Sequence, residues 1–157
     1  MKTLKLLFLS LILIGSFSCS SDDDETSTPP DDSLQLSDIV GSWKATSSVH
    51  TNNANAAESF DIIANGGEIR FTLLAHGGVR TWIDFGDFHD EYDSQASISG
   101  DILTNTPVES GRPIRRFIVS KVGNTLTLIN ENDAFDFTLS GDSPVTSTSV
   151  TTMVPNI

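Results

Sequence analysis

Short segments of alternating polar and apolar residues, separated by turn residues, fill the chain from residue 34 onward. The alternation is clean at 125–128, where Thr and Leu take turns, and at 135–139, where Phe, Phe and Leu alternate with Asp and Thr. A period of two places successive side chains on opposite faces of a strand, one face buried and one wet. No long amphipathic helical pattern interrupts these segments, and residues 34–40 predict a single helical turn. The pattern predicts an all-β domain.

Turn signals bound the expected strands. Gly77 and Gly78 permit the positive φ that a hairpin turn requires, and Gly100, Gly111 and Gly123 mark further breaks. About eight or nine strands at such close spacing are typical of an antiparallel barrel of about eight strands, with a β-sandwich as the alternative. Residues 50–58, rich in Asn and Ala, are expected to form a loop. The expected strands are 42–49, 68–74, 79–85, 92–98, 102–108, 114–122, 125–129, 134–139 and 145–154. Residues 60–63 are expected to form a short strand or the approach to one.

The first 18 residues have the form of a secretory signal peptide. Residues 1–5 carry two lysines and no acid, and 6–14 are apolar apart from Ser10. This apolar run is about half of the ~20 residues that a membrane-spanning helix needs. A short basic segment, a short apolar segment and then small residues are the marks of a cleaved leader.

The only cysteine, Cys19, directly follows this leader, so the chain cannot form an internal disulfide. Residues 16–19, Ser-Phe-Ser-Cys, resemble the lipobox of bacterial lipoproteins. The resemblance implies that Cys19 becomes the first residue and carries acyl chains, each worth ~0.8 kcal/mol per buried CH₂ in a bilayer. The family prefers Leu where Ser16 stands, and Phe17 is bulky for its place. Ser16 and Ser18 also suit ordinary signal peptidase, which would release a soluble protein.

Residues 19–33 form an acidic stretch without a large aliphatic or aromatic side chain. Such a segment cannot contribute to a core, and we expect a disordered tether. The serines and acids just after Cys19 resemble the surface-export signal of lipoproteins from the Bacteroidetes group. That resemblance implies the outer membrane, with the cell surface as one destination; a plain solvated spacer is the alternative.

The remaining residues, 34–157, are expected to form one globular domain of acidic character. The whole chain has 157 residues, 38% of them hydrophobic, and a net charge of −12. Residues 34–157 hold seven Lys and Arg against fifteen Asp and Glu, a net charge near −8. Nucleic-acid affinity comes largely from cations that meet phosphates, so this balance argues against a nucleic-acid partner. It also argues against direct docking on anionic lipid head groups.

A second resemblance concerns this domain. The sequence Val40-Gly41-Ser42-Trp43-Lys44 resembles the opening G-x-W strand of lipocalins. The later stretches ISGDIL and VGNTLTLINENDAFDFTL resemble the hairpins of lipocalin-like domains that are common in bacterial lipoproteins, and the likeness spans most of 34–154. It implies a barrel that binds a small apolar or amphipathic molecule. Lipocalins often pair the tryptophan with an arginine of the final strand, and 146–154 contains none.

Motifs for catalysis or metal binding are weak. The chain has no P-loop, G-x-G-x-x-G, H-E-x-x-H or G-x-S-x-G pattern, and His50, His76 and His89 share no ligand spacing. The stretch 84–93 has five carboxylates, which are the oxygen ligands that Ca²⁺ prefers, but it lacks EF-hand spacing. We interpret it as a solvated acidic rim and expect no metal, no cofactor and no enzymatic activity. A glycoside or ester hydrolase is the remote alternative.

Arg115 and Arg116 are adjacent within an expected strand, so they face opposite sides of the sheet. A guanidinium that faces the interior needs a carboxylate partner from the protein or from a ligand. The candidate ligand-binding residues are Arg115, Arg116 and the tryptophan of the G-x-W resemblance, Trp43. The leading interpretation is a lipid-anchored protein that binds a small amphipathic molecule. A filled barrel that serves as a structural or protein-interaction module of the outer membrane is the second interpretation.

Overall fold

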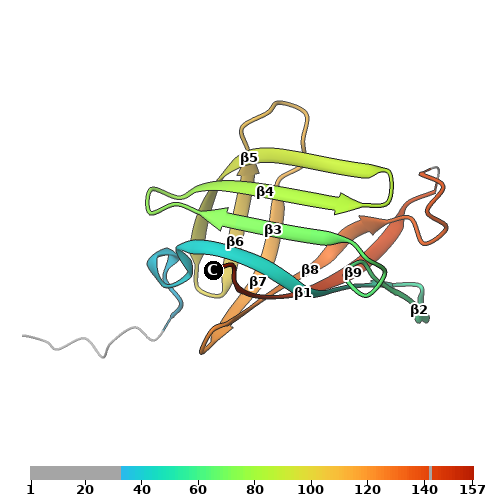
Figure 1. Ribbon diagram of the computed structural model, residues 1–157, viewed down its shortest axis with the longest axis horizontal. Helices are drawn as coiled ribbons and strands as arrows, with labels where there is room; N and C mark the ends of the chain where they lie inside the picture. The colour runs from blue at the N-terminus through green and yellow to red at the C-terminus, as the bar shows by residue number, and fades with distance from the viewer. Residues whose placement is uncertain (1–32, 142) are drawn as a thin grey trace, which may run out of the picture. The chain divides into compact units, whose positions relative to one another are not determined.

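The computed structural model describes residues 33–141 and 143–157 as nine strands and one short 3₁₀ helix (Figure 1). The predicted signal peptide 1–18, Cys19 and all of the predicted tether except Ser33 lie outside the described residues. Within the described part, no helix is long and apolar enough to cross a membrane. The elements are η1 (Leu36–Ile39), β1 (Gly41–Asn52), β2 (Asn55–Asp61), β3 (Glu68–Leu73), β4 (Gly78–Phe85), β5 (Phe88–Ser99), β6 (Ile102–Pro107), β7 (Arg115–Val122), β8 (Thr125–Phe135) and β9 (Val145–Pro155).

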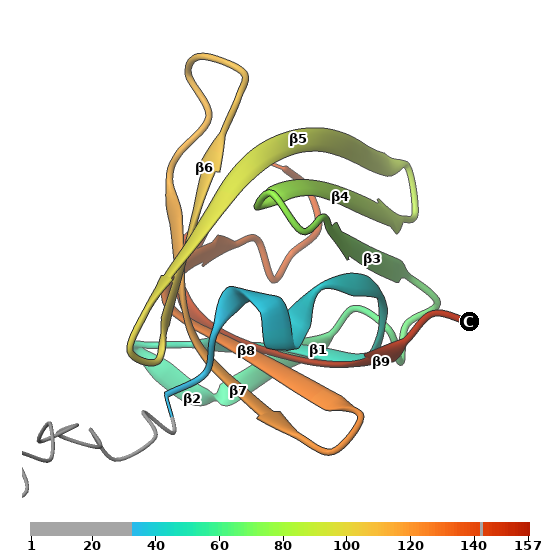
Figure 2. The same ribbon diagram turned by 90° about the vertical axis from the view of Figure 1, so that its left-hand side faces the viewer.

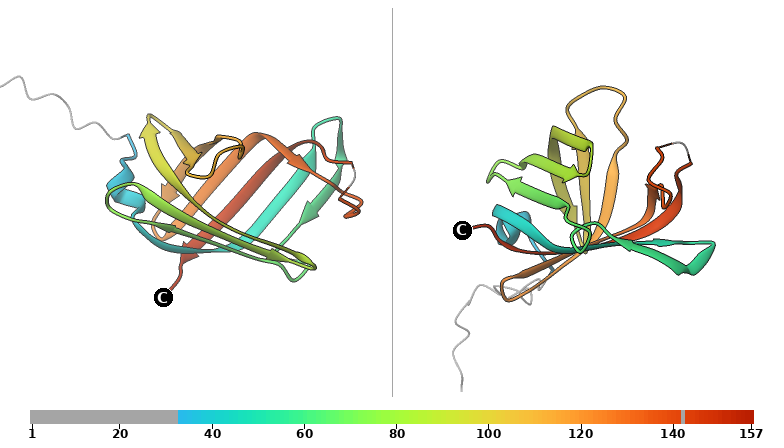
Figure 3. Two further views of the ribbon diagram at one scale, coloured as in Figure 1. Left: turned by 90° about the horizontal axis from the view of Figure 1, so that it is seen from above. Right: turned by 45° about the vertical axis from the view of Figure 1, so that its right-hand side comes forward.

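Eight strands close into an antiparallel barrel. Strands β3 to β9 pair in chain order, and β1 pairs with β3 on one side and with β9 on the other. The β1–β9 pairing extends from Trp43 to Asn52, so the sheet has no open edge between its first and last strands. The predicted all-β antiparallel barrel is confirmed, and the sandwich alternative is excluded. Strand β2 lies outside the closed barrel and pairs with residues 49–52 of β1. Figure 3 (left) shows η1 and β2 at opposite ends of the barrel.

The predicted β3–β4 hairpin depends on Gly77, whereas Gly78 does not adopt a positive φ. Gly77 has a φ of 86°, a left-handed conformation that L side chains rarely adopt. A Cβ atom there would also lie 3.0 Å from the Ala96 carbonyl oxygen. The Gly77 N–H donates to the Leu74 carbonyl and closes the turn. His76 lies in this turn.

The loop predicted at 50–58 is wrong. β1 continues to Asn52, the turn is short, and β2 begins at Asn55. The Asn52 side-chain oxygen accepts a bond from the Ala54 N–H, and its amide donates to Glu58. Asn and Ala are poor strand formers, but β1 pairs with β9 as far as Asn52. This tertiary pairing overrides local propensity.

The separate strand predicted at 134–139 is also wrong. β8 continues from Thr125 to Phe135 across a bulge between Asn130 and Asp133, where a turn was expected. Residues 136–141 then form a loop around the Asp136 carboxylate. That carboxylate accepts bonds from the backbone N–H groups of Thr138 and Gly141, so the alternation of 135–139 is not strand alternation.

The end of the barrel next to η1 is filled by side chains. Figure 2 looks toward this end and shows η1 lying across it. Ile39 of η1 is fully buried, and the Trp43 indole Nε1 donates to its carbonyl oxygen at 2.8 Å. The final strand has no arginine for Trp43, and η1 supplies the polar partner instead. This packed floor comprises Ile39, Trp43, Ala45, Leu73, Val79, Ala96, Leu103, Val119, Leu126 and Met153.

Candidate functional site

A cavity of about 720 Å³ opens in the barrel above the packed floor, toward the end remote from η1. This volume falls within the ~300–1,000 Å³ typical of small-molecule sites. Apolar side chains form most of its wall, and they come from six strands of the barrel: Ile69 and Phe71 of β3, Ile83 and Phe85 of β4, Phe88 and Tyr92 of β5, Phe117 of β7, Leu128 and Phe135 of β8, and Met153 of β9. The barrel is therefore only partly filled.

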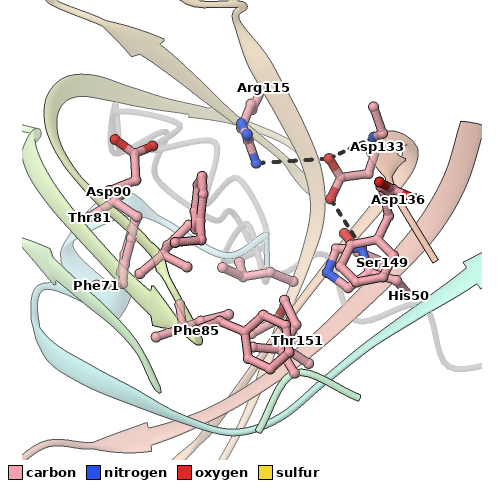
Figure 4. A pocket seen from close by; sticks show the side chains of 18 of the residues that line it. His50, Phe71, Thr81, Phe85, Asp90, Arg115, Asp133, Asp136, Ser149 and Thr151 are labelled. Carbon is pink, nitrogen blue, oxygen red and sulfur yellow. Dashed lines mark hydrogen bonds and ion pairs between the residues drawn. The ribbon is translucent and has the colours of Figure 1, made fainter. Parts of the chain in front are cut away.

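Arg115, the first residue of β7, faces this cavity. It shares the inner face with Phe117 and Val119, so the register settles which of the two adjacent arginines is inside. Its Nη1 lies 3.8 Å from Oδ1 of Asp133 on β8, which is too long for a hydrogen bond (Figure 4). The Asp133 Oδ1 atom also accepts a 3.0 Å bond from the Ala134 N–H. A guanidinium has five N–H donors, so most of the donors of Arg115 remain available to a ligand.

His50 of β1 lies on the other side of Asp133. Its side chain is 9% exposed, and its ring stacks on Phe135 with centroids 4.3 Å apart. His50 Nδ1 is 3.7 Å from Asp133 Oδ2 and has no hydrogen-bond partner among the described residues. Burial lowers the pKa of His50, and this effect exceeds the opposite effect of the Asp133 carboxylate. The imidazole is therefore neutral at pH 7.

Two bulges bring His50 and Asp133 inside. From Trp43 and Ala45, strict alternation would turn His50 outward, but β1 has a register shift between Ala45 and Ser47. From Leu128, strict alternation would likewise turn Asp133 outward, but β8 has a shift between Asn130 and Asp133. A bulge adds a residue and re-aims the side chains beyond it. Both shifts place a polar group at the cavity.

A second ion pair stands at the cavity rim. Arg112, in the β6–β7 loop, donates from Nη1 and Nη2 to the two carboxylate oxygens of Asp90, both at 2.8 Å. Its Nε donates to Glu109 at 2.7 Å, and its guanidinium lies 4.8 Å from the Tyr92 ring centroid. The Arg112 bonds hold the pKa of Asp90 below its usual value. Asp90 therefore faces the cavity as a carboxylate whose two oxygens are already bonded to Arg112, in contrast to the loosely paired Arg115.

A cluster of aromatic rings adjoins the cavity wall formed by Phe85 and Phe135. Phe60 of β2 lies 5.4 Å from Phe85 and 5.5 Å from Phe135, between ring centroids, and Phe135 contacts Phe137 at 5.0 Å. Phe60 does not line the cavity, but it packs against two rings that do, so β2 supports the wall from outside the closed barrel. Sequence reasoning missed Phe60, because its strand was expected to be short and was given no role.

The structure separates the three predicted ligand-binding residues. Arg115 lines the cavity, Arg116 is exposed on the outer face of β7, and Trp43 is packed in the floor at 4% exposure. The cavity lining does not include Trp43 or Arg116. Trp82 lies on the outer face of β4, where Arg70 covers its ring at 4.8 Å.

The acidic stretch 84–93 is a hairpin, not a cluster. Asp84 pairs with His89 across β4 and β5, and alternation separates Asp90, which faces the cavity, from Glu91 and Asp93. Because of this division, no group of three or more metal-binding side chains gathers among residues 33–141 and 143–157. Asp93 instead receives two bonds from Arg80 on the outer surface.

Comparison with known proteins gave no match. No family model matches this chain, and searches of curated proteins and of solved structures found no significant similarity. The resemblances to bacterial lipoproteins and to lipocalin-like domains therefore stay predictions from the residues themselves.

Proposed function

We propose that the barrel binds a small amphipathic molecule and that Arg115 meets the acidic end of this molecule. The observation that carries the proposal is the cavity of about 720 Å³, whose wall is mostly apolar and which has a loosely paired arginine on its inner face. Eight-stranded barrels have room for one small ligand when side chains leave the interior open. The apolar body of the ligand lies against rings such as Phe71, Phe85 and Phe117.

Arg115 is the cation best suited to this role. Arg112 is occupied by Asp90 and Glu109 through three short bonds, whereas Arg115 makes one ion pair, of 3.8 Å, within the described part of the chain. A bidentate guanidinium–carboxylate contact is among the stronger hydrogen-bonded pairs in proteins. The fork of Arg115 has enough donors to keep Asp133 on one side and to hold a ligand carboxylate on the other.

The competing function is a structural or protein-interaction module with no ligand. The packed floor around Trp43 is consistent with that reading, because buried apolar side chains pack together at that end of the barrel. The cavity above the floor favours a ligand, because a purely structural barrel gains stability when apolar side chains fill it.

We propose further that the domain is held at the cell envelope by a lipid on Cys19, at the outer membrane. The support lies in the sequence alone: the short leader, the single cysteine in a lipobox-like setting and the serines and acids that follow. In this proposal the protein is a binding protein rather than an enzyme.

Calorimetric titration with a panel of fatty acids and bile acids tests the ligand proposal. The wild-type protein should bind at least one acid, and Arg115→Ala should weaken that binding about ten- to hundredfold, the value of a charged hydrogen bond. Arg116→Ala is the matched control, because it removes the same side chain from the outer face of the same strand. It should leave the affinity unchanged.

Each other outcome has a definite meaning. If the wild-type protein binds no acid of the panel, the ligand-free module becomes the better interpretation. If binding occurs and Arg115→Ala does not weaken it, the cavity is the site but the arginine has no part in recognition. The methyl ester of the best acid is a further control, since the loss of Arg115 should not weaken its binding.

A further inference from the structure

A band of polar side chains crosses four neighbouring strands on the inner face of the barrel. It consists of Thr81 on β4, Ser94 on β5, Asn105 on β6 and Arg115 on β7. Asn105 and Arg115 are direct cross-strand partners. Ser94 is the diagonal neighbour of both Thr81 and Asn105, because Tyr92 faces Thr81 and Ala96 faces Asn105. Such neighbours on one face of a sheet are within reach of a shared ligand or of each other.

Three members of this band are buried without a partner. Thr81 Oγ1, Ser94 Oγ and Asn105 Oδ1 make no hydrogen bond within the described residues, and their side chains are 7%, 3% and 3% exposed. Buried polar atoms in native proteins are nearly always hydrogen-bonded, and an unpaired one costs ~1–3 kcal/mol. Thr81 and Asn105 line the cavity, while Ser94 continues the band between them.

The opposite wall of the cavity holds one pair of polar side chains that satisfy each other. Ser48 of β1 and Thr151 of β9 also line the cavity, but their hydroxyl groups bond each other at 2.9 Å. Five buried side-chain atoms are unpaired among the described residues: His50 Nδ1 on β1, Ser147 Oγ on β9, and the three atoms of the band. The band is the part of this set that adjoins Arg115 on neighbouring strands.

We infer that the ligand is an amphipathic acid with hydroxyl groups on its apolar body. The inference depends on the proposed function, since it places the acid at Arg115 and a hydroxyl group at Asn105 and Thr81. A hydroxyl group both donates and accepts, so it suits the threonine hydroxyl and either orientation of the asparagine amide. An unsubstituted alkyl or ring body would leave both side chains buried and unpaired. A site built to bond a hydroxyl group discriminates strongly against analogues that lack it.

Matched pairs of acids test the inference by calorimetry. Cholate and lithocholate share a ring system and a carboxylate but differ in two hydroxyl groups, and 12-hydroxystearate and stearate differ in one. The wild-type protein should prefer the hydroxylated member of at least one pair by tenfold or more. Asn105→Leu and Thr81→Val, which keep the approximate size of each side chain, should reduce that preference to threefold or less.

Thr106→Val is the control, because Thr106 follows Asn105 on β6 and is exposed on the outer face. It should keep the wild-type preference. If the wild-type protein binds the acids but prefers the hydroxylated member of neither pair, the hydroxyl inference is overturned and the proposed function stands. If it binds none of the acids, both fail.

The melting temperatures of the ligand-free proteins give a second readout. Because Thr81 Oγ1 and Asn105 Oδ1 have no hydrogen-bond partner among the described residues, Thr81→Val and Asn105→Leu should melt at or above the wild-type temperature. A fall of several degrees in both variants, absent in Thr106→Val, would show that these groups serve the fold. That result would overturn the inference.

Discussion

At the scale of single residues, Trp43 has a polar partner although the final strand lacks the arginine that lipocalins often pair with this tryptophan. The indole ring is 4% exposed within the floor, and its one polar atom bonds the Ile39 carbonyl of η1 at 2.8 Å. The same ring therefore contributes apolar burial and satisfies a carbonyl at the end of a short helix. The covering helix depends on a residue that lies just beyond it in the chain.

Trp43→Ala should reduce the free energy of unfolding by ~3–5 kcal/mol, the range for truncating a large aromatic side chain in a core. Trp82→Ala is the matched control, since Trp82 lies half-buried on the outer face of β4 under Arg70. Its cost should be about 1 kcal/mol. Urea denaturation of the two variants measures both values. A loss below about 1 kcal/mol for Trp43→Ala would contradict its role as the centre of the floor.

At the scale of elements, the segment after β8 is organised by one carboxylate. Asp136 accepts bonds from the Thr138 hydroxyl at 2.6 Å, from the Thr138 N–H at 2.9 Å and from the Gly141 N–H at 2.6 Å. These bonds lower the pKa of Asp136 to about 2, and the Thr138 hydroxyl has the largest part. The loop holds Leu139 at a φ of 56°, a strained value for leucine, and this side chain lines the cavity mouth.

The order of this loop should therefore depend on pH in the acid range. The folded-state pKa of Asp136 is below its usual value of 3.8, so its bonds stabilise the loop above that pH and are lost as the pH falls through about 2. The amide proton of Gly141, followed by NMR, should titrate with a midpoint near 2. Asp136→Asn should remove this step, and a midpoint near 4 in the wild-type protein would contradict the loop geometry.

The elements also show what the sequence does and does not determine. A period of two and glycine turns predicted short antiparallel strands, in a barrel or a sandwich, and placed Arg115 and Arg116 on opposite faces without showing which one is inside. The inward positions of His50 and Asp133 were not predictable, because each follows a bulge and a one-residue shift turns a side chain to the other face. Thr81 and Asn105 look like ordinary polar strand residues until their buried, unpaired atoms are seen.

At the scale of the whole molecule, the sequence comprises a predicted leader, an acidic stretch and a barrel domain that carries its own net charge near −8. An acidic domain gains nothing from contact with anionic lipid head groups, so its surface is a poor membrane anchor. Acyl chains on Cys19 would supply that anchor independently of the barrel. Membrane attachment and ligand binding should then be separable by mutation.

Cys19→Ser should abolish attachment while leaving the barrel intact. In cells grown with labelled palmitate, the wild-type protein should carry the label and sediment with membranes, because several acyl chains together hold a protein firmly on a bilayer. Cys19→Ser should be unlabelled and should leave the membrane fraction. Ser21→Ala, just past the proposed cleavage site, should behave as the wild-type protein does. The purified Cys19→Ser protein should bind acids with wild-type affinity, because no cavity residue is altered.

If Cys19→Ser still sediments with membranes, lipidation is not the anchor. If the wild-type protein itself is unlabelled and soluble, ordinary signal peptidase processes the leader.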